Sequence, residues 1–199
     1  MTDTSNRTLR NFRIVLWALV VVVAIGATAL YLLRPPARPL AVTGTPFTLT
    51  ATTGETFTQE DLIGEPSLVF FGFTNCPDVC PTTLAETTMW KEQLGLTAED
   101  LRVIFVTVDP ERDTLDMVRG YLAGWDPQII GLVGDEDQTE AAKSAFGVFS
   151  EKVGEGEFYT VNHTALVFLI DANGTFQGTI AYEEPTESAL AKIRRLVAT

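Results

Sequence analysis

The amino-acid sequence predicts an α/β domain that is preceded by a single transmembrane helix. Three observations lead to this fold class. An uncharged apolar stretch lies near the N-terminus, at residues 14–33. The continuous apolar run at residues 67–73 is typical of a strand buried on both faces, residues 101–109 predict a second buried strand, and helical patterns alternate with these strands. Near the C-terminus, two strand patterns joined by Asn173-Gly174 predict a hairpin, and a last helix follows.

The first element is a run of twenty residues without a charge, Ile14 to Leu33. As a helix it extends roughly 30 Å, at about 1.5 Å per residue, which matches the hydrocarbon core of a bilayer. Trp17 and Tyr31 lie near its two ends, where aromatic side chains favour the interface. A slight excess of arginine before the run favours a cytoplasmic N-terminus. We therefore expect a bacterial inner-membrane protein whose C-terminal domain lies in the periplasm.

A cleaved signal peptide is the alternative, because Ala27-Thr28-Ala29 offers a small-residue cleavage site. The apolar run continues past this site to Leu33, which favours an uncleaved anchor. The proline-rich residues that follow predict an extended spacer. We thus expect a cytoplasmic tail at 1–13, an anchor at 14–33, a linker at 34–41 and a folded domain at 42–199.

The exported part of the chain is strongly acidic. Of 14 basic residues, four precede residue 35 and 10 remain; of 26 acidic residues, only Asp3 precedes it and 25 remain. The resulting charge of −15 argues against a nucleic-acid partner and against docking on anionic lipid headgroups. It is compatible with a basic protein partner or with solubility alone.

The order of elements after residue 45 is thioredoxin-like. A short N-terminal hairpin turns at Thr53-Gly54, and a helical turn follows at 58–62. The remaining predicted elements are a strand at 67–73, a helix at 81–94, a strand at 101–109, a helix at 114–122, a strand at 129–134, a helix at 135–147, strands at 164–171 and 176–182, and a helix at 185–197.

The segment FFGFTNCPDVCP, residues 70–81, holds both cysteines of the chain, and each precedes a proline. A residue before proline is biased away from the α-region, so we expect Cys76 and Cys80 to bracket a small loop. Pro81 then suits the first position of the helix. Since a helix N-terminus lowers the pKa of nearby thiols, these cysteines are candidates for chemistry.

The cysteine pair can serve as a disulfide staple, a redox couple or a metal clamp. A staple is the weakest of the three, because so small a loop gains the least from closure. His163, the only histidine, is expected to begin a strand, and on spacing alone a structural role is the commoner one. In a thioredoxin-like order, however, the loop before this strand faces the cysteines. Two thiolates and one imidazole suit copper better than zinc, which normally has a fourth protein ligand in structural sites.

Two acidic residues are candidates for supporting roles. Asp109 ends the second buried strand, where it can accept a hydrogen bond from a ligand side chain, add negative charge near a metal, or cap the turn before Pro110. Asp78 lies within the cysteine loop and is expected to be exposed, where a partner can contact it. Arg112 and Asp113 are expected to pair with each other or to cap the next helix.

Three motifs, FTNCPDVCP, VTVDPERDT and YTVNHTALVFLID, resemble those of the Sco/SenC family of copper chaperones over residues 42–199. The resemblance implies a thioredoxin-like domain that binds one copper ion, Cu(I) or Cu(II), through Cys76, Cys80 and His163. It implies delivery to the CuA site of cytochrome c oxidase subunit II, or reduction of the cysteines there, and an upstream copper donor. Asp109 matches an acidic residue linked in the family to metal loading and partner contact. Asn162 stands where the family commonly has aspartate.

Other functions compete with a metallochaperone. A thiol–disulfide oxidoreductase would use Cys76 to attack a target disulfide and Cys80 to resolve it, although the spacing differs from the usual C-x-x-C. A peroxidase is disfavoured, because Thr74 lies one position too close to the cysteine. We expect no other classical enzyme active site.

Overall fold

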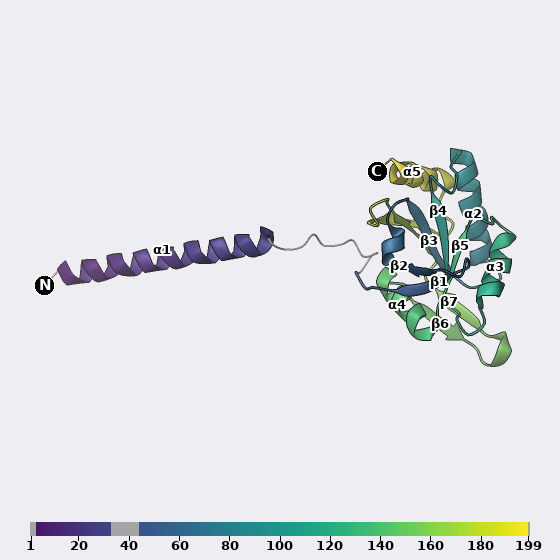
Figure 1. The fold of residues 1–199 in the computed structure, drawn as a ribbon, viewed down its shortest axis with the longest axis horizontal. Coiled ribbons are helices and arrows are strands. Elements are labelled where there is room, and N and C mark those ends of the chain that lie inside the picture. Colours follow the sequence, from purple (N-terminus) through teal and green to yellow (C-terminus); the bar gives the residue numbers. More distant parts are fainter. Residues whose placement is uncertain (1–2, 33–43, 199) are drawn as a thin grey trace. The chain divides into compact units, whose positions relative to one another are not determined.

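The computed structural model describes residues 3–32 and 44–198 (Figure 1). The chain divides into two compact units, one containing helix α1 (Asp3–Leu32) and the other an α/β domain. Leu33 of the predicted anchor and the predicted linker at 34–41 lie outside the described residues.

Helix α1 contains the described part of the predicted anchor. Its apolar side chains are solvent-exposed: Ile14, Trp17 and Val22 are each more than 60 % exposed. Among the residues that the structure describes, however, no helix was found to be both long and apolar enough to cross a membrane. The transmembrane helix is therefore not confirmed and stays a prediction.

The α/β domain is built on a seven-stranded sheet of order β2-β1-β5-β4-β3-β8-β9. Strands β3, β4 and β5 are parallel, and the flanking pairs are antiparallel. The elements in chain order are β1 (Thr48–Ala51), β2 (Thr56–Thr58), η1 (Gln59–Leu62), β3 (Ser67–Gly72), α2 (Val79–Leu94), β4 (Arg102–Thr107), α3 (Leu115–Ala123), β5 (Ile130–Val133), α4 (Glu136–Phe146), β6 (Ser150–Val153), η2 (Gly156–Phe158), β7 (Thr160–His163), β8 (Leu166–Ile170), β9 (Phe176–Ala181) and α5 (Thr186–Val197). This arrangement confirms the predicted thioredoxin-like order.

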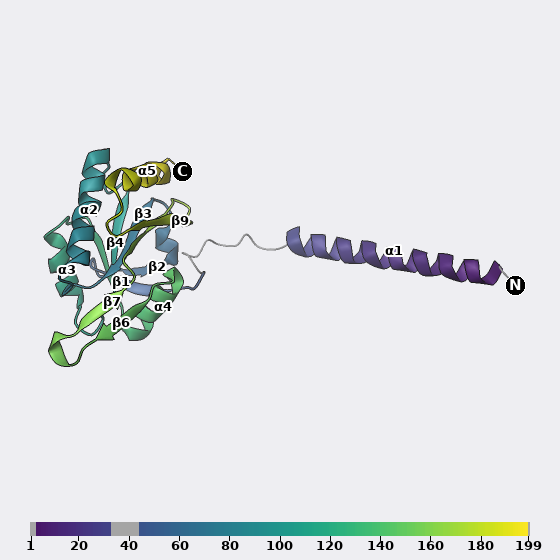
Figure 2. The ribbon, with the colours of Figure 1, turned by 180° about the vertical axis from the view of Figure 1, so that it is seen from behind.

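The core forms around the two strands that the sequence predicts to be buried, residues 67–73 and 101–109. Every residue of β3 is buried, and five of the six residues of β4 are buried beside it. Phe71 packs against Phe146 of α4 and Phe168 of β8, with ring centroids 5.2 Å and 6.1 Å apart. Burying a side chain of this size contributes about 2 kcal/mol to stability, so the central strands form a rigid base for the segments at their ends. Helices α2 and α5 lie side by side (Figure 2).

Helix α2 begins earlier than the prolines predict. It starts at Val79, so Cys80 is a helical residue and does not end a loop before the helix. The amide of Thr82 donates to the carbonyl of Asp78 at 3.1 Å and closes the first turn. Pro81 is tolerated there because amides in the first turn of a helix have no intrahelical partner to lose.

A second, two-stranded sheet was not predicted. Strands β6 and β7 pair antiparallel, and Ser150 is opposite His163. His163 therefore ends β7, and the prediction that it begins the next strand is wrong, because β8 starts only at Leu166. The hairpin has no alternating apolar pattern to reveal it, since most of its strand residues are exposed.

Candidate metal centre

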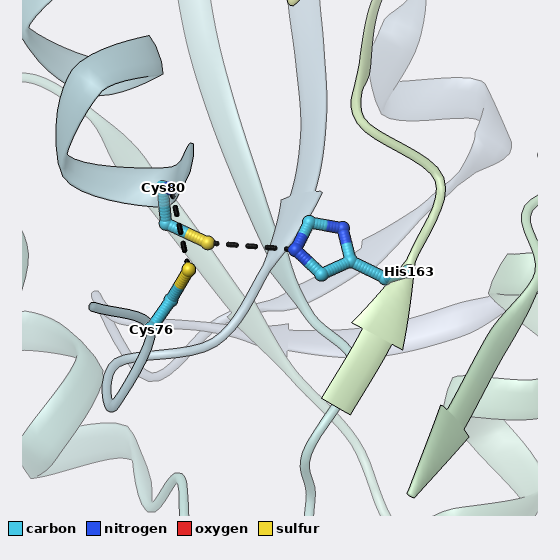
Figure 3. Close-up of side chains that lie close together, drawn as sticks. All are labelled: Cys76, Cys80 and His163. Atoms are coloured by element: carbon cyan, nitrogen blue, oxygen red, sulfur yellow. Dashed lines mark hydrogen bonds between the residues drawn. The ribbon is translucent and has the colours of Figure 1, made fainter. Parts of the chain in front are cut away.

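Cys76 lies on the segment that connects β3 to α2, beyond the buried end of β3, and Cys80 lies in the first turn of α2. Figure 3 shows the Cys76 side chain on the loop, Cys80 at the start of α2 and His163 at the end of a strand, converging from three segments. The amide of Cys76 donates to the carbonyl of Phe73 at 3.2 Å, and the amide of Cys80 donates to Cys76 Sγ at 3.4 Å. Local backbone bonds thus turn the loop so that both sulfurs face the histidine.

The three predicted ligands are close together. Cys76 Sγ, Cys80 Sγ and a ring nitrogen of His163 all lie within 4.8 Å of one another. Cys80 Sγ is 3.6 Å from His163 Nε2. Neither cysteine is in a disulfide; Cys80 is fully buried and Cys76 is half-buried. Among the histidine, cysteine, aspartate and glutamate side chains that the structure describes, these three form the group that is close enough to hold a metal ion.

The imidazole of His163 has a defined orientation. Its Nδ1 lies 3.1 Å from the carbonyl oxygen of Thr164, and because a carbonyl can only accept, Nδ1 carries the proton. Nε2 then presents its lone pair to the sulfurs, as a metal ligand must. Phe70 and Phe73 contact the ring edge-on, with centroids 6.1 Å and 5.8 Å away. Asn162, the departure from the family pattern, is exposed, and the orienting bond comes from Thr164 instead.

The two thiols differ strongly in acidity. A hydrogen bond from Cys80 lowers the pKa of Cys76 to about 4, against the opposing effect of partial burial, and backbone amides add to the lowering. The same contact with Cys76, together with burial, raises the pKa of Cys80 far above its usual value. The apo site therefore holds one thiolate and one thiol, and binding a metal to both sulfurs releases the proton of Cys80.

Gly72 has a role that the sequence analysis missed. It is the last residue of β3, and a Cβ placed there would lie 2.8 Å from Cys80 Sγ and 2.9 Å from the rings of Phe70 and Phe105. A glycine at this point leaves the space that the Cys80 side chain occupies. The available signal was a glycine within an otherwise apolar strand, four residues before a cysteine, which indicates a close approach of other groups.

Asp109 does not bond to any of the three ligands. The residue is 4 % exposed, and its carboxylate accepts from Arg112 Nε and from the Tyr159 hydroxyl, both at 2.6 Å. Arg112 also donates to the carbonyl of Tyr159 at 2.9 Å and stacks over its ring. Because Tyr159 directly precedes β7, Asp109 anchors the hairpin that carries His163.

The hydrogen bonds of Asp113 also differ from those that the sequence predicts. It neither pairs with Arg112 nor caps α3, whose N-cap is Thr114. Instead, its carboxylate accepts from the amide and hydroxyl of Thr74 and from the hydroxyl of Thr107. It thereby connects the start of the cysteine loop to the end of β4.

The candidate metal centre opens into a shallow pocket of about 240 Å³. The pocket is lined by Phe73 and residues 76–79 on one side, and by residues 160–163 and Ala165 on the other. Asp78 is exposed at its rim, as expected, and its side chain makes no capping bond to α2 although it occupies the N-cap position. Cys76 lines the pocket and is thus the sulfur that an approaching molecule meets first.

Comparison with known proteins agrees with this geometry. The sequence model of the SCO1/SenC family matches residues 35–198. The SCO2-like protein of Rickettsia felis is 38% identical over 174 residues, which cover 79% of this chain and 85% of that protein. The structure of Bradyrhizobium japonicum ScoI with copper bound is 39% identical, with a TM-score of 0.69 over 76% of this chain and 97% of that one. BsSco, a member of the Sco family of cytochrome c oxidase assembly proteins with an identified disulfide switch, is 26% identical, with a TM-score of 0.60 over 77% and 92% of the two chains.

Proposed function

The chain belongs to the SCO1/SenC family, and from that premise we propose that it is a copper metallochaperone. It binds one copper ion through Cys76 Sγ, Cys80 Sγ and His163 Nε2. The observation that carries the proposal is the convergence of these three atoms within 4.8 Å, from segments far apart in the sequence. The copper-bound relative from Bradyrhizobium japonicum supports the choice of metal.

The donor set favours copper over zinc. Two soft thiolates suit Cu(I), and an imidazole added to them suits Cu(II). A structural zinc site is usually closed by four protein ligands, and the chain has no third cysteine or second histidine to provide the fourth. Three ligands beside an open pocket leave one side of the ion accessible.

Delivery of copper follows from this open side. We propose that the acceptor is the CuA site of cytochrome c oxidase subunit II, a role supported by the similarity to BsSco, which belongs to a family of oxidase assembly proteins. A thiolate of the acceptor enters beside Cys76, forms a bond to copper and replaces one protein sulfur. The ion keeps its oxidation state throughout, and the proton released on loading returns to Cys80.

The test of this function is copper transfer. The Cu(I)-loaded full-length chain is mixed anaerobically with the metal-free CuA domain of subunit II. An oxidant is then added, and the absorption bands of the oxidised CuA centre are followed. We expect the bands to appear with the unaltered chain and to be absent with Cys76→Ser. Tight copper binding without any transfer would contradict delivery while leaving the binding site intact.

A thiol–disulfide oxidoreductase is the second candidate, and the unequal acidity of the two thiols favours it. The Cys76 thiolate attacks one sulfur of a target disulfide, forms a mixed disulfide and expels the other target sulfur as a thiolate. Cys80 then loses its proton, attacks Cys76 and releases the reduced target. Reductase activity that survives His163→Ala but not a change of either cysteine would identify this function.

Membrane attachment is a separate proposal. We propose that residues 14–33 hold the chain in a bacterial inner membrane, with the α/β domain in the periplasm. The uncharged sequence of this segment and the exposed apolar side chains of α1 support it. Carbonate extraction of cell membranes should leave the chain in the pellet, and its release into the soluble fraction would contradict the anchor.

A further inference from the structure

Asp113 is a buried carboxylate that accepts hydrogen bonds from the start of the cysteine loop and from the end of β4. It is 0 % exposed. Its Oδ2 accepts from the amide of Thr74 at 3.0 Å and from the hydroxyl of Thr107 at 2.6 Å. Its Oδ1 accepts from the hydroxyl of Thr74 at 2.6 Å. Three donors thus converge on one side chain.

These hydrogen bonds connect the start of the cysteine loop to the end of the neighbouring strand β4. Thr74 begins the loop two residues before Cys76, whereas Thr107 is the last residue of β4, the strand beside β3. The Thr107 hydroxyl donates to Asp113 and accepts from the amide of Asp109 at 3.1 Å. The chain of bonds therefore runs from the cysteine loop through Asp113 to the segment that anchors Tyr159.

A buried carboxylate is a costly way to stabilise a loop. Burial raises the pKa of Asp113, and the hydrogen bonds from Thr107 and Thr74 only oppose that effect. An apolar residue would avoid the cost of desolvation, but it could not hold Thr74 by both its amide and its hydroxyl. What the carboxylate provides is a fixed position for the loop.

We propose that Asp113 is a positioning residue of the metal centre, which fixes the start of the cysteine loop so that both sulfurs are presented to His163. The expected effect on copper affinity rests on the proposed copper function, whereas the hydrogen bonds that hold the cysteine loop do not depend on it. Groups that orient metal ligands typically change metal affinity by about 10- to 100-fold when they are removed. Asp113 acts on the sulfurs through the backbone of residues 74–76.

The chain offers a matched control in Asp171. This aspartate is 5 % exposed and also accepts three hydrogen bonds, from the amides of Asn173 and Thr175 and from the side chain of Gln177. It holds the turn between β8 and β9, away from the cysteine loop. The two aspartates thus share burial and bonding but differ in what they hold.

The experiment compares Asp113→Ala, Asp113→Asn, Thr74→Val and Asp171→Ala in the full-length chain. Two quantities are measured: Cu(I) affinity by chelator competition, and, without metal, the equilibrium between the Cys76–Cys80 dithiol and a glutathione buffer. We expect Asp113→Ala and Thr74→Val to weaken Cu(I) binding by about tenfold or more. They should also disfavour the Cys76–Cys80 disulfide by about threefold, because a loosened loop lowers the effective concentration of one thiol at the other.

The controls make the outcome decisive. Asp113→Asn keeps an acceptor for the Thr74 amide and should retain most of the affinity, whereas Asp171→Ala should lower stability and change neither measured quantity. If Asp113→Ala does not fold, the isosteric Thr74→Val decides the question. Unchanged copper affinity and an unchanged thiol equilibrium in Thr74→Val, or equal effects of Asp171→Ala, would overturn the inference. If the unaltered chain binds no copper, the proposed function fails, and the metal-free thiol equilibrium still tests Asp113.

Discussion

The proposed metal centre joins two regions that differ in how deeply their residues are buried. The cysteines extend from β3, whose six residues are all buried, and Asp113 holds the start of their loop. His163 instead ends β7 of a two-stranded hairpin in which most strand residues are exposed. Phe158, in the connection between its strands, is 95 % exposed. The proposed sulfur ligands therefore come from a well-packed region, whereas the proposed nitrogen ligand comes from a largely exposed hairpin.

This difference suggests how one site can both hold and release an ion. Regions with few buried apolar contacts open at a lower free-energy cost than the core does. We expect the sulfur pair to keep its geometry with and without metal, while the histidine is the ligand that can move away. The hairpin is held to the domain by Tyr159, through Asp109 and Arg112, and this attachment sets how easily it moves.

The largest effect is expected from disturbing the rigid region. Gly72→Ala places a Cβ 2.8 Å from Cys80 Sγ, so the sulfur or the adjacent rings must shift. Overpacking of this kind costs about 1–3 kcal/mol, and we expect Cu(I) affinity to fall together with the free energy of unfolding. Denaturant unfolding and chelator competition measure the two.

Gly120→Ala is the control for that substitution. Gly120 lies in α3, and a Cβ added there would have no neighbouring atom within 4 Å. Alanine at this position should stabilise the helix by about 0.5–1 kcal/mol. Equal behaviour of the two variants would show that the space beside Cys80 is not needed.

A smaller effect is expected from loosening the hairpin. Tyr159→Phe removes the hydroxyl that donates to Asp109 at 2.6 Å and leaves a buried carboxylate with one partner fewer. We expect a loss of about 1–3 kcal/mol in stability and weaker Cu(II) binding, with Cu(I) binding less affected because it depends on the sulfurs. Equal losses for the two oxidation states would mean that the hairpin and the cysteine loop respond as one unit.

The unequal thiols give a prediction on pH. Because the pKa of Cys76 is lowered to about 4, the apo protein should react with iodoacetamide at this residue even at acidic pH. Cys80→Ala removes the hydrogen bond that is the main cause, so the pH profile of alkylation should move upward. Peptide mass spectrometry identifies the labelled residue. A profile of the unaltered chain centred near the ordinary thiol pKa would contradict the assignment.

The smallest effect is expected at Asn162. Since Thr164 orients the ring and the side chain at 162 is exposed, Asn162→Asp should change copper affinity by less than about threefold. A tenfold or larger gain would show that the departure from the family pattern weakens the site. The measurement is again chelator competition.

The sequence predicted the central sheet because apolar runs such as 67–73 can be buried only as interior strands, and it predicted the three converging residues through their order in that fold. It did not predict the β6–β7 hairpin, whose exposed strands have no apolar periodicity. The start of α2 was also missed, because the local preference of a residue before proline was overridden by the first helical turn. The bonds of Asp109 and Asp113 depend on long-range packing, which spacing along the chain does not reveal.

The most direct test of the account is an anaerobic Cu(I) titration of the reduced chain, followed by the absorption spectrum with Cu(II), for the unaltered protein, Cys80→Ser and His163→Ala. We predict one equivalent of tightly bound Cu(I) that is lost with Cys80→Ser. In His163→Ala, Cu(I) should remain bound while the Cu(II)–thiolate band changes. Negligible Cu(I) binding by the unaltered chain, or a Cu(II) spectrum that does not depend on His163, would contradict a copper site made from a rigid sulfur pair and a histidine on the hairpin.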